Sequence, residues 1–449
     1  MTHRSGSIAG PLVLIVIGTA LLLRDRFPGL ALGALFLRYW PVLLILWGLV
    51  RLVEFYSAPS GQVRTGLSST EVSLLLVGFL LLGFISFTMR VSHSEFGHEM
   101  GLGDGGIGFL GHDWMRQRFP FSAHLQQPLK VGEPLWIQGQ RGDVVVAPAS
   151  DGQLSLDASD QVAGSSSSDA ATLFQHSQPT LHEEGGHYVL QAAGESNDAV
   201  IANLRLQVPP TTPVQVETGR GDLQLSGWKA AVSLSTQRGA ATVRDVHGDV
   251  KISAHHDSVR VERVSGRVEI EGNGDDVTLA DIQGPVTLNG DFSGSFQLER
   301  LAQGLQFTSN RSQLSAAALP GSLTGDRSAM RIDSVERLSF DTRDKEIEVG
   351  HFRGALHVRN AHGSVNVTTD AVPVEPLEII TSQGEISLTL PAASQFALDA
   401  SARRGSIDSQ FPVTVNDDGH LAQVHGRVGS KGPPVTLETS DSSISLHKE

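Results

Sequence analysis

A short pattern that occurs three times in succession, over residues 248–303, constrains the fold more than any other feature of the chain. Its glycines at 248, 266, 284 and 304 are 18, 18 and 20 residues apart. In each copy, two short runs alternate apolar and polar residues, a period that places the apolar side chains on one face of a strand. The inward residues are Val250/Ile252 and Val259/Val261, Val268/Ile270 and Val277/Leu279, Val286/Leu288 and Phe296/Leu298, and Val264, Ile282 and Leu301 before the closing glycines. Two strands per repeat of about 18 residues predict the coil of a β-solenoid.

One such coil cannot fold alone, because burying five apolar side chains does not offset the entropy lost when the whole coil is ordered. Stacking removes this difficulty, since each strand then pairs with the coils above and below, and the inward side chains join one core. We expect the glycines to occupy the tight turns at the coil corners, where their conformational freedom is needed. The fold class is therefore all-β, a single-stranded β-helix-like solenoid with repeats of about 16–20 residues.

The same rhythm extends beyond the three copies, and we assign residues 211–449 to solenoid repeats with a C-terminal cap. After residue 304 the repeat continues at steps of 17, 17 and 16 to Gly321, Leu338 and Gly354. Leu338 then replaces a corner glycine, so this copy should be the least regular, with a different turn type. The last coil is expected at residues 434–448.

Residues 121–210 are β-rich but break the strict period, and we assign them as an N-terminal cap and lead-in that covers the open end of the stack. Short strands are predicted at 135–137, 144–146 and 154–156, with glycines between them. The segment DAATLFQHS, which follows a serine-rich stretch, is expected to form one or two helical turns.

The segment from His182 to His187 resembles the zinc-binding helix of metalloproteases. Its histidines are five apart, where one helical face needs four, and Gly185-Gly186 opposes a helix. A β-turn is predicted here instead.

The first ninety residues are predicted to form an α-helical membrane module of three spans, at 8–23, 39–55 and 72–89. Each run is apolar, with charges only between the runs, and each approaches the roughly 20 residues that a membrane-spanning helix needs. A cleaved signal peptide is the alternative for the first run, but no small-residue cleavage site follows it. The arginines flanking the spans divide three against four, so charge does not decide the orientation.

Residues 91–120 are predicted to be a glycine-rich linker. Gly101-x-Gly103-x-x-Gly106 matches a dinucleotide-binding pattern, but the strand before it and the helix after it are missing. The linker histidines, His93, His98 and His112, fit no closed set of metal ligands.

Composition excludes several classes of function. The chain has 48 acidic and 34 basic residues and a formal charge of −14, which argues against nucleic acid as a partner. It has no cysteine, so it has no thiolate nucleophile, disulfide or cysteine metal site.

The outward-facing positions of the coils offer no recognisable catalytic set. The two outward columns are Lys251, Glu269 and Thr287, and Arg260, Thr278 and Gln297, and neither stacks acids for metal binding or acid–base chemistry. Asp275-Asp276 is the densest acidic spot in the regular coils, and a solvated turn is favoured over a calcium site there. We therefore assign no catalytic, cofactor-binding or metal-binding residue, and predict that the chain is not an enzyme.

Repeated phrases in the chain carry a resemblance to a known family. TSQGEISL, RRGSIDS and VTLETSDSSISL, with the earlier LRLQVPPTTPVQVETGRGDLQL, resemble a family of candidate bacterial adhesins of unknown function with toast-rack-like β-solenoid domains, over about 120–449. GPLVLIVIGTALLL and RYWPVLLILWGLVRL, with the third span, are similar to the LiaI–LiaF-like transmembrane region of bacterial envelope proteins. The resemblance implies a multi-pass protein of the bacterial cytoplasmic membrane with its C-terminal domain outside, and it brings no catalytic residues.

Three functions follow as hypotheses. The first is a membrane-anchored envelope protein whose solenoid is a non-catalytic surface for binding, adhesion or scaffolding, with a protein or glycan partner on the solenoid face. The alternative is an envelope-stress regulator whose membrane part contacts a sensor or anti-sigma system. A carbohydrate-active β-helix enzyme ranks third. The sequence leaves open the ligand, the handedness of the solenoid and the oligomeric state.

Overall fold

The structure is a computed structural model that describes residues 117–449, except 131, 151 and 193–198. The predicted spans at 8–23, 39–55 and 72–89, and the linker features, including the glycine pattern at 101–106, lie outside the described residues. In the described part there are 30 strands and one helix. No helix in this part is both long and apolar enough to cross a membrane.

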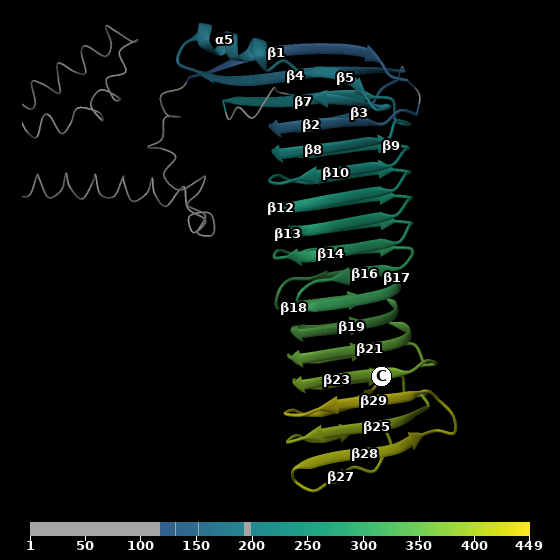
Figure 1. The fold of residues 1–449 in the computed structure, drawn as a ribbon. Helices are drawn as coiled ribbons and strands as arrows, with labels where there is room; N and C mark the ends of the chain where they lie inside the picture. Colours follow the sequence, from purple (N-terminus) through teal and green to yellow (C-terminus); the bar gives the residue numbers. More distant parts are fainter. Residues whose placement is uncertain (1–116, 131, 151, 193–198) are drawn as a thin grey trace, which may run out of the picture. The chain divides into compact units, whose positions relative to one another are not determined.

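The strands form a stack of coils with two faces, and each regular coil contributes one strand to each face (Figure 1). Val250 pairs with Val268 and Val259 with Val277, both in parallel register, so the 18-residue repeat predicted from the sequence is confirmed as the offset between coils. The first face runs through β6 (His187–Gln191), β2 (Leu135–Arg141), β8 (Val214–Arg220), β10 (Val232–Thr236), the first halves of β12 (Val250–Val264) and β13 (Val268–Ile282), β14 (Val286–Phe292) and β16 (Leu305–Thr308). The second face runs through β7 (Val200–Val208), β3 (Val144–Pro148), β9 (Leu223–Trp228), β11 (Ala241–Val246), the second halves of β12 and β13, and β15 (Phe296–Leu301).

The inward side chains of both faces form one hydrophobic core from Leu129 to Leu446. Every apolar residue predicted to face inward in the three copies is buried, as alternation requires. Trp228, the largest buried side chain, donates a hydrogen bond from its indole nitrogen to the carbonyl oxygen of Thr212 at 2.9 Å. The polar group of this bulky side chain is therefore paired inside the core.

Each coil turns at two corners. Corner one leads from the first face to the second (residues 219–222 and 237–240), and corner two leads back to the first face (residues 247–249, 265–267 and 283–285). The predicted glycines occupy corner two, but for a different reason from the one expected. Gly248, Gly266 and Gly284 do not have a left-handed φ. A Cβ atom on any of them would lie 2.1–2.4 Å from a carbonyl oxygen of the preceding coil, so close stacking requires the glycine.

The regular winding reverses once, after β16. The long strand β17 (Ser312–Gly325) runs antiparallel to β16 and β15 on one side, and antiparallel to β19 (Glu336–Asp344) and β18 (Ala329–Asp333) on the other. The expectation that Leu338 replaces a corner glycine is wrong, because Leu338 is a buried strand residue that pairs with Ala316 and Leu356. The irregular coil lies before it, at β17.

A second parallel stack follows the reversal, and its coils are not in chain order. Its first face contains β19, β21 (Arg353–His362), β23 (Leu377–Gln383), β29 (Pro434–Thr439) and β25 (Phe396–Arg403). Its second face contains β18, β20 (Glu346–Gly350), β22 (Val365–Thr368), β24 (Ile386–Leu390), β30 (Ile444–Lys448) and β26 (Ile407–Ser409). The last coil of the sequence is therefore inserted between two earlier ones, as Figure 1 shows for β29.

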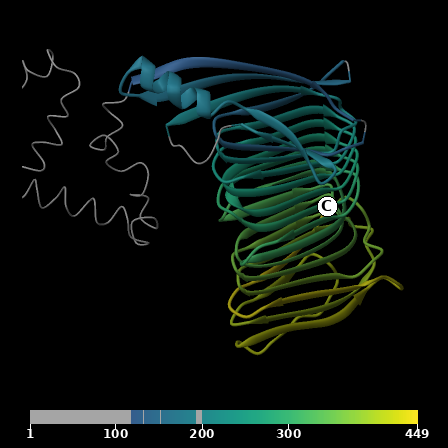
Figure 2. The same ribbon diagram turned by 45° about the horizontal axis from the view of Figure 1, so that its top comes forward.

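Antiparallel elements cover both ends of the stack (Figure 2). At the C-terminal end, β28 (Leu421–Val428) pairs with β25 and with β27 (Asn416–Asp417). At the N-terminal end, β1 (Gln117–Pro128) pairs with β4 (Gln153–Gly164), β4 pairs with β7, and β5 (Thr180–Glu184) pairs with β6. Such pairing protects edges that would otherwise be open to another chain.

The helix α5 (Ser167–His176) confirms the helical turns predicted in DAATLFQHS. The Ser166 hydroxyl accepts a hydrogen bond from the backbone N–H of Asp169, an N-cap that satisfies one of the first free donors of the helix. Phe174 stacks on Phe121 of β1 with ring centroids 4.7 Å apart, so the helix packs over the terminal strands.

Candidate binding surface

The histidines at 182 and 187 belong to a hairpin. β5 and β6 pair with Glu184 opposite His187, and Gly185 and Gly186 form the turn with φ of 58° and 83°. The predicted β-turn is confirmed, and its two positive φ values explain the glycine pair. The His187 ring stacks on Trp136 at 3.9 Å between ring centroids.

The two outward columns predicted from the sequence are in register in the structure. Lys251, Glu269 and Thr287 are successive partners, as are Arg260, Thr278 and Gln297. Lys251 Nζ lies 3.2 Å from Glu269 Oε1 and 3.3 Å from Glu271 Oε2, and the hydrogen bond to Glu269 raises the pKa of the lysine. Among residues that the structure describes, no group of three or more His, Asp or Glu is placed to hold a metal ion.

A third column, which the sequence analysis did not identify, follows the end of the second-face strands. Asp245, Arg263, Asp281 and Arg300 all have a left-handed φ of 52–57°, and Gly227 has φ of 74° at the equivalent place. The chain needs this kink because both Val261 and Val264 face inward although they are three residues apart. The three-residue spacing between inward apolar residues could have indicated the kink from sequence.

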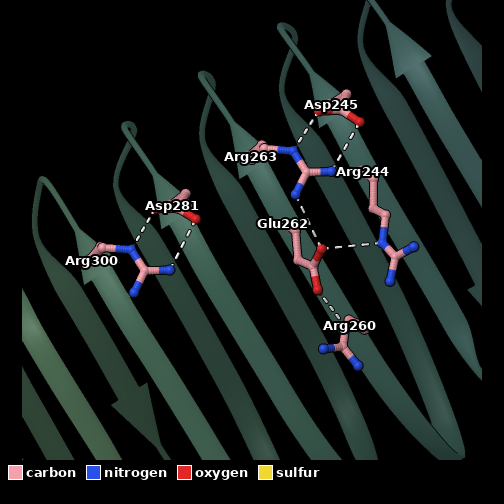
Figure 3. A network of polar contacts seen from close by, with 7 residues as sticks. All are labelled: Arg244, Asp245, Arg260, Glu262, Arg263, Asp281 and Arg300. Atoms are coloured by element: carbon pink, nitrogen blue, oxygen red, sulfur yellow. Dashed lines mark hydrogen bonds and ion pairs between the residues drawn. The ribbon is translucent and has the colours of Figure 1, made fainter.

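Acidic and basic residues alternate along this column (Figure 3). Arg263 donates from Nε and Nη2 to the two carboxylate oxygens of Asp245, at 2.6 and 3.1 Å. Arg300 makes the same pair with Asp281, at 2.6 and 3.0 Å. These hydrogen bonds lower the pKa of Asp245 and of Asp281. Opposite charges in adjacent coils thus face each other, which favours the native coil order over a shifted one.

Beside this column, Glu262 forms ion pairs with three arginines. Its oxygens lie 2.5 Å from Arg260 Nε, 3.2 Å from Arg244 Nε and 3.3 Å from Arg263 Nη1. The hydrogen bond from Arg260 is the largest cause that lowers the pKa of Glu262. Glu262 therefore stays a carboxylate, and is not suited to act as a general acid near neutral pH.

Two substitutions of Arg263 separate the effect of the left-handed backbone on stability from the effect of the ion pair with Asp245. We expect Arg263→Val to lower the unfolding temperature more than Arg263→Gly, because a β-branched residue is strained at φ of 55° whereas glycine is not. Both variants lose the pair with Asp245, so the difference between them isolates the backbone. Thermal unfolding followed by circular dichroism measures it, and equal unfolding temperatures would contradict the assignment.

The acidic pair at Asp275 and Asp276 lies in a corner-one turn, and its carboxylates bind the next coil. Asp276 Oδ1 accepts hydrogen bonds from the backbone N–H and the hydroxyl of Ser295, at 2.7 and 2.8 Å. The backbone bond is the largest cause that lowers the pKa of Asp276. Asp275 Oδ1 accepts from the Ser293 hydroxyl at 3.1 Å. Both carboxylates therefore join their turn to the turn of the next coil through hydrogen bonds.

A polar hollow of about 570 Å³ opens at corner one of the N-terminal coils. Arg141, Arg220 and Arg238 line it, each followed by a glycine with φ of 125–142°. Arg141 and Arg220 are register partners, and Gly221 donates its N–H to the carbonyl oxygen of Arg238. Three adjacent coils therefore each place an arginine at this corner. The sequence analysis missed this group, although the arginine-glycine pairs at each corner could have indicated it.

A second hollow of about 350 Å³ lies where the winding reverses, and it is lined by both turns that flank β17. Three phenylalanines, Phe292, Phe296 and Phe307, form its apolar side. Lys345 is almost fully buried there, and its ammonium donates a hydrogen bond to the carbonyl oxygen of Asp326. Burial lowers the pKa of Lys345. Lys345 therefore stabilises the turn after β17 by a hydrogen bond to its backbone.

Comparison with known proteins adds two family matches. Residues 256–447 match the family model described as Toastrack DUF4097, and residues 9–95 match the LiaF transmembrane domain. No curated protein matches the chain.

Two solved structures are similar to the chain. One is a candidate cell adhesion protein from Clostridium sporogenes, with 8% identity and a TM-score of 0.17, over 74% of this chain and 100% of the other. The other is a candidate adhesin from Bacteroides fragilis, with 8% identity and a TM-score of 0.22, over 73% of this chain and 97% of the other. At these scores the two structures add nothing to the family matches.

The family matches agree with the parallel stack of coils and with the resemblance drawn from the sequence. The chain is therefore a membrane protein with a match to the LiaF transmembrane domain at residues 9–95, and residues 256–447 of its β-solenoid match the Toastrack domain.

Proposed function

We propose that this protein presents its β-solenoid outside the bacterial cytoplasmic membrane as a non-catalytic binding surface. In this proposal three helices within residues 1–90 form the anchor and residues 91–120 are the tether. Residues 121–210 cap and lead into the solenoid, which occupies residues 211–449. The solenoid then holds its ligand away from the membrane, where it serves adhesion or envelope scaffolding.

The observation that carries this proposal is the in-register stacking of outward side chains. Neighbouring strands of a sheet lie about 4.7–4.9 Å apart, so side chains from several coils can act together on one elongated ligand. The interior of the stack is filled by the core, which leaves the outer faces and corners for recognition. The carboxylates of the densest acidic spot, Asp275 and Asp276, are bound by Ser293 and Ser295, and Glu262 is bound by arginines. This arrangement supports binding better than acid–base catalysis.

Separating the two parts of the chain tests the proposal. The described strands lie in one compact unit, His112–Glu449, which can be produced as a soluble fragment. We expect this fragment to retain material from isolated cell envelopes, whereas a fragment of residues 1–95 in detergent should not. Protease added to spheroplasts, in which the outer face of the cytoplasmic membrane is accessible, should also remove the solenoid. Retention by the membrane fragment alone, or a solenoid protected from the protease, would contradict the proposal.

A regulatory function is the second candidate, and the match of residues 9–95 to the LiaF transmembrane domain favours it. The membrane part would then contact a sensor protein, and the solenoid would respond to an envelope signal. Deletion of residues 1–90 distinguishes the two functions. It should abolish an envelope-stress response if the protein is a regulator, and should leave ligand binding by the solenoid unchanged if the protein is a binding module.

A further inference from the structure

We infer that the second hollow, at the point where the winding reverses, binds a small carboxylate with an aromatic body. The inference goes beyond the proposed function, which concerns large envelope partners on the outer faces of the solenoid. Three observations carry it: a gap in the solenoid wall, a buried ammonium group without an ion pair, and an apolar side of three phenylalanines. We call this second hollow the reversal hollow.

The reversal hollow exists because one coil of the solenoid does not close at corner one. In the coil before the reversal, the chain passes corner one between β14 and β15, at residues 293–295. In the coil after it, the chain passes the same corner between β19 and β20, at Lys345. Between these coils, β16 turns back into β17 at residues 309–311, and β17 turns back into β18 at residues 326–328. These two hairpin turns are not joined to each other, so the wall is open between them.

Lys345 places a buried positive charge beside this gap. Only 9% of its surface is exposed, and its ammonium donates a hydrogen bond to the carbonyl oxygen of Asp326. Within the described part of the chain, no carboxylate forms an ion pair with it. Burial is the largest cause that lowers the pKa of Lys345, and the nearby charge of Arg311 acts in the same direction, whereas Asp326 opposes both. A buried charge is costly unless it is paired, so an anion in the hollow would supply the missing partner.

The rim of the reversal hollow has further cationic groups for a ligand. Arg311 and Arg327 belong to the two hairpin turns, and among the residues that the structure describes their guanidinium groups have no hydrogen bond or ion pair. The three acids of the lining, in contrast, already have partners. Asp291 accepts from the N–H of Asn310 at 3.0 Å, Asp326 accepts from the N–H groups of Ser328 and Ala329 at 2.7 and 2.9 Å, and Asp344 lies 2.8 Å from His362 Nδ1. The arginine forks match the two oxygens of a carboxylate.

The apolar side of the reversal hollow favours a ligand with an aromatic ring. The ring centroids of Phe292 and Phe296 are 6.3 Å apart at an angle of 83°, and those of Phe296 and Phe307 are 5.2 Å apart at 58°. Another aromatic ring packs well against such edges and faces. The volume of about 350 Å³ suits a small molecule, since ligand pockets typically measure roughly 300–1,000 Å³. We therefore place the ring against the phenylalanines and the carboxylate at Lys345 and Arg311.

The test uses the full chain in nanodiscs of zwitterionic lipid, with empty nanodiscs as the blank. Binding of para-trifluoromethylbenzoate is measured by fluorine NMR, from the broadening of its signal. Para-trifluoromethylbenzamide has the same ring without the charge, and inorganic phosphate, added as a competitor, has charge without the ring. We expect the benzoate to bind and the benzamide to bind about tenfold more weakly or less. Phosphate should displace the benzoate only at a much higher concentration than unlabelled benzoate does.

Three variants complete the test. Lys345→Met should weaken benzoate binding about tenfold or more, because it removes the buried charge and keeps the length of the side chain. Arg311→Gln, at an exposed position of a hairpin turn, should weaken it about threefold or more, and it keeps the test decisive if Lys345→Met does not fold. Lys251→Met is the matched control, because Lys251 pairs with Glu269 and Glu271 on the first face, and it should bind like the unmodified chain. Circular dichroism verifies that each variant is folded.

The outcomes decide the inference without touching the proposed function. Absence of benzoate binding, or equal affinities for the benzoate and the benzamide, would overturn it. So would a folded Lys345→Met or Arg311→Gln variant that binds the benzoate as tightly as Lys251→Met does. Phosphate that competes as well as unlabelled benzoate would also overturn it, and would leave a site for simple anions. Retention of envelope material by the solenoid fragment is a separate measurement, and the proposed function depends on that result alone.

Discussion

Gly266→Ala should destabilise the solenoid by about 1–3 kcal/mol or more, although it adds only one methyl group. The new Cβ would lie 2.4 Å from the carbonyl oxygen of Gly248 and 2.7 Å from the Asp249 carboxylate. The backbone cannot easily move away. Val250 donates its N–H to the Arg267 carbonyl at 2.8 Å, and Arg267 donates its N–H to Asp249 at 2.8 Å. The clash must therefore break hydrogen bonds between adjacent coils.

Gly304→Ala is the matched control, because Gly304 ends the same series of glycines in the sequence. A Cβ atom there would meet its nearest neighbour, the carbonyl oxygen of Ala316, at 3.8 Å, an ordinary contact. We expect this variant to unfold within a few degrees of the unmodified chain. Thermal unfolding followed at 218 nm gives the comparison, and hydrogen exchange of the β12 and β13 amides should show opening only in Gly266→Ala. Equal losses in the two variants would show that close stacking does not explain the glycines.

Asp160→Asn should stabilise the protein above pH 6, with a gain of about 3 kcal/mol at most. Asp160 lies on β4 among inward-facing residues, with 1% of its surface exposed, and in the described part neither carboxylate oxygen has a hydrogen-bond partner. Its strand neighbours are Phe121 of β1 and Ala202 of β7. Burial raises the pKa of Asp160 to about 6. A neutral asparagine avoids the cost of placing the charge there.

The pH dependence follows from the same shift. The pKa rises from 3.8 in the unfolded chain to about 6 in the folded one, so the folded state binds more protons between these values. The stability of the unmodified chain should then fall as the pH rises through this window, and the advantage of Asp160→Asn should vanish near pH 4. Asp408→Asn, at an exposed position of β26, is the control. An advantage that does not change between pH 4 and pH 8 would contradict the role of ionisation.

Much of the solenoid was predictable because its strands and turns are determined by residues that are close together in the sequence. The alternation at Val250/Ile252 and Val259/Val261 indicates the strands, and the repeat of 18 residues indicates which coil lies above which. The hairpin at Gly185-Gly186 was also predictable, because two adjacent glycines permit the positive φ values that its turn needs. In each case, neighbouring residues suffice to determine the local structure.

The direction of β17 was not predictable in this way. Its inward residues, among them Leu314, Ala316 and Leu323, alternate with outward ones as in every other coil. A strand read in either direction presents the same alternation, so the pattern does not distinguish parallel from antiparallel pairing. Only the pairing of β17 with its neighbours fixes the direction, and with it the second hollow.

The polar hollow at corner one of the N-terminal coils also depends on the tertiary structure. Arg141 and Arg220 are 79 residues apart in the chain, and no 18-residue step connects them. They meet because β2 leads directly into β3, whereas the cap elements and β7 intervene before β8 adds to the same face. The hollow therefore could not be predicted from the repeat alone.

The sequence by itself determined that this protein would stack two-stranded coils around a narrow apolar core, because inward alternation and the repeat length are properties of short segments. The tertiary structure alone decided the reversal at β17, the insertion of β29 and β30 between earlier coils, and the grouping of the three arginines. These features depend on which strand edges pair, and edge hydrogen bonds between backbones carry little information about the side chains that flank them.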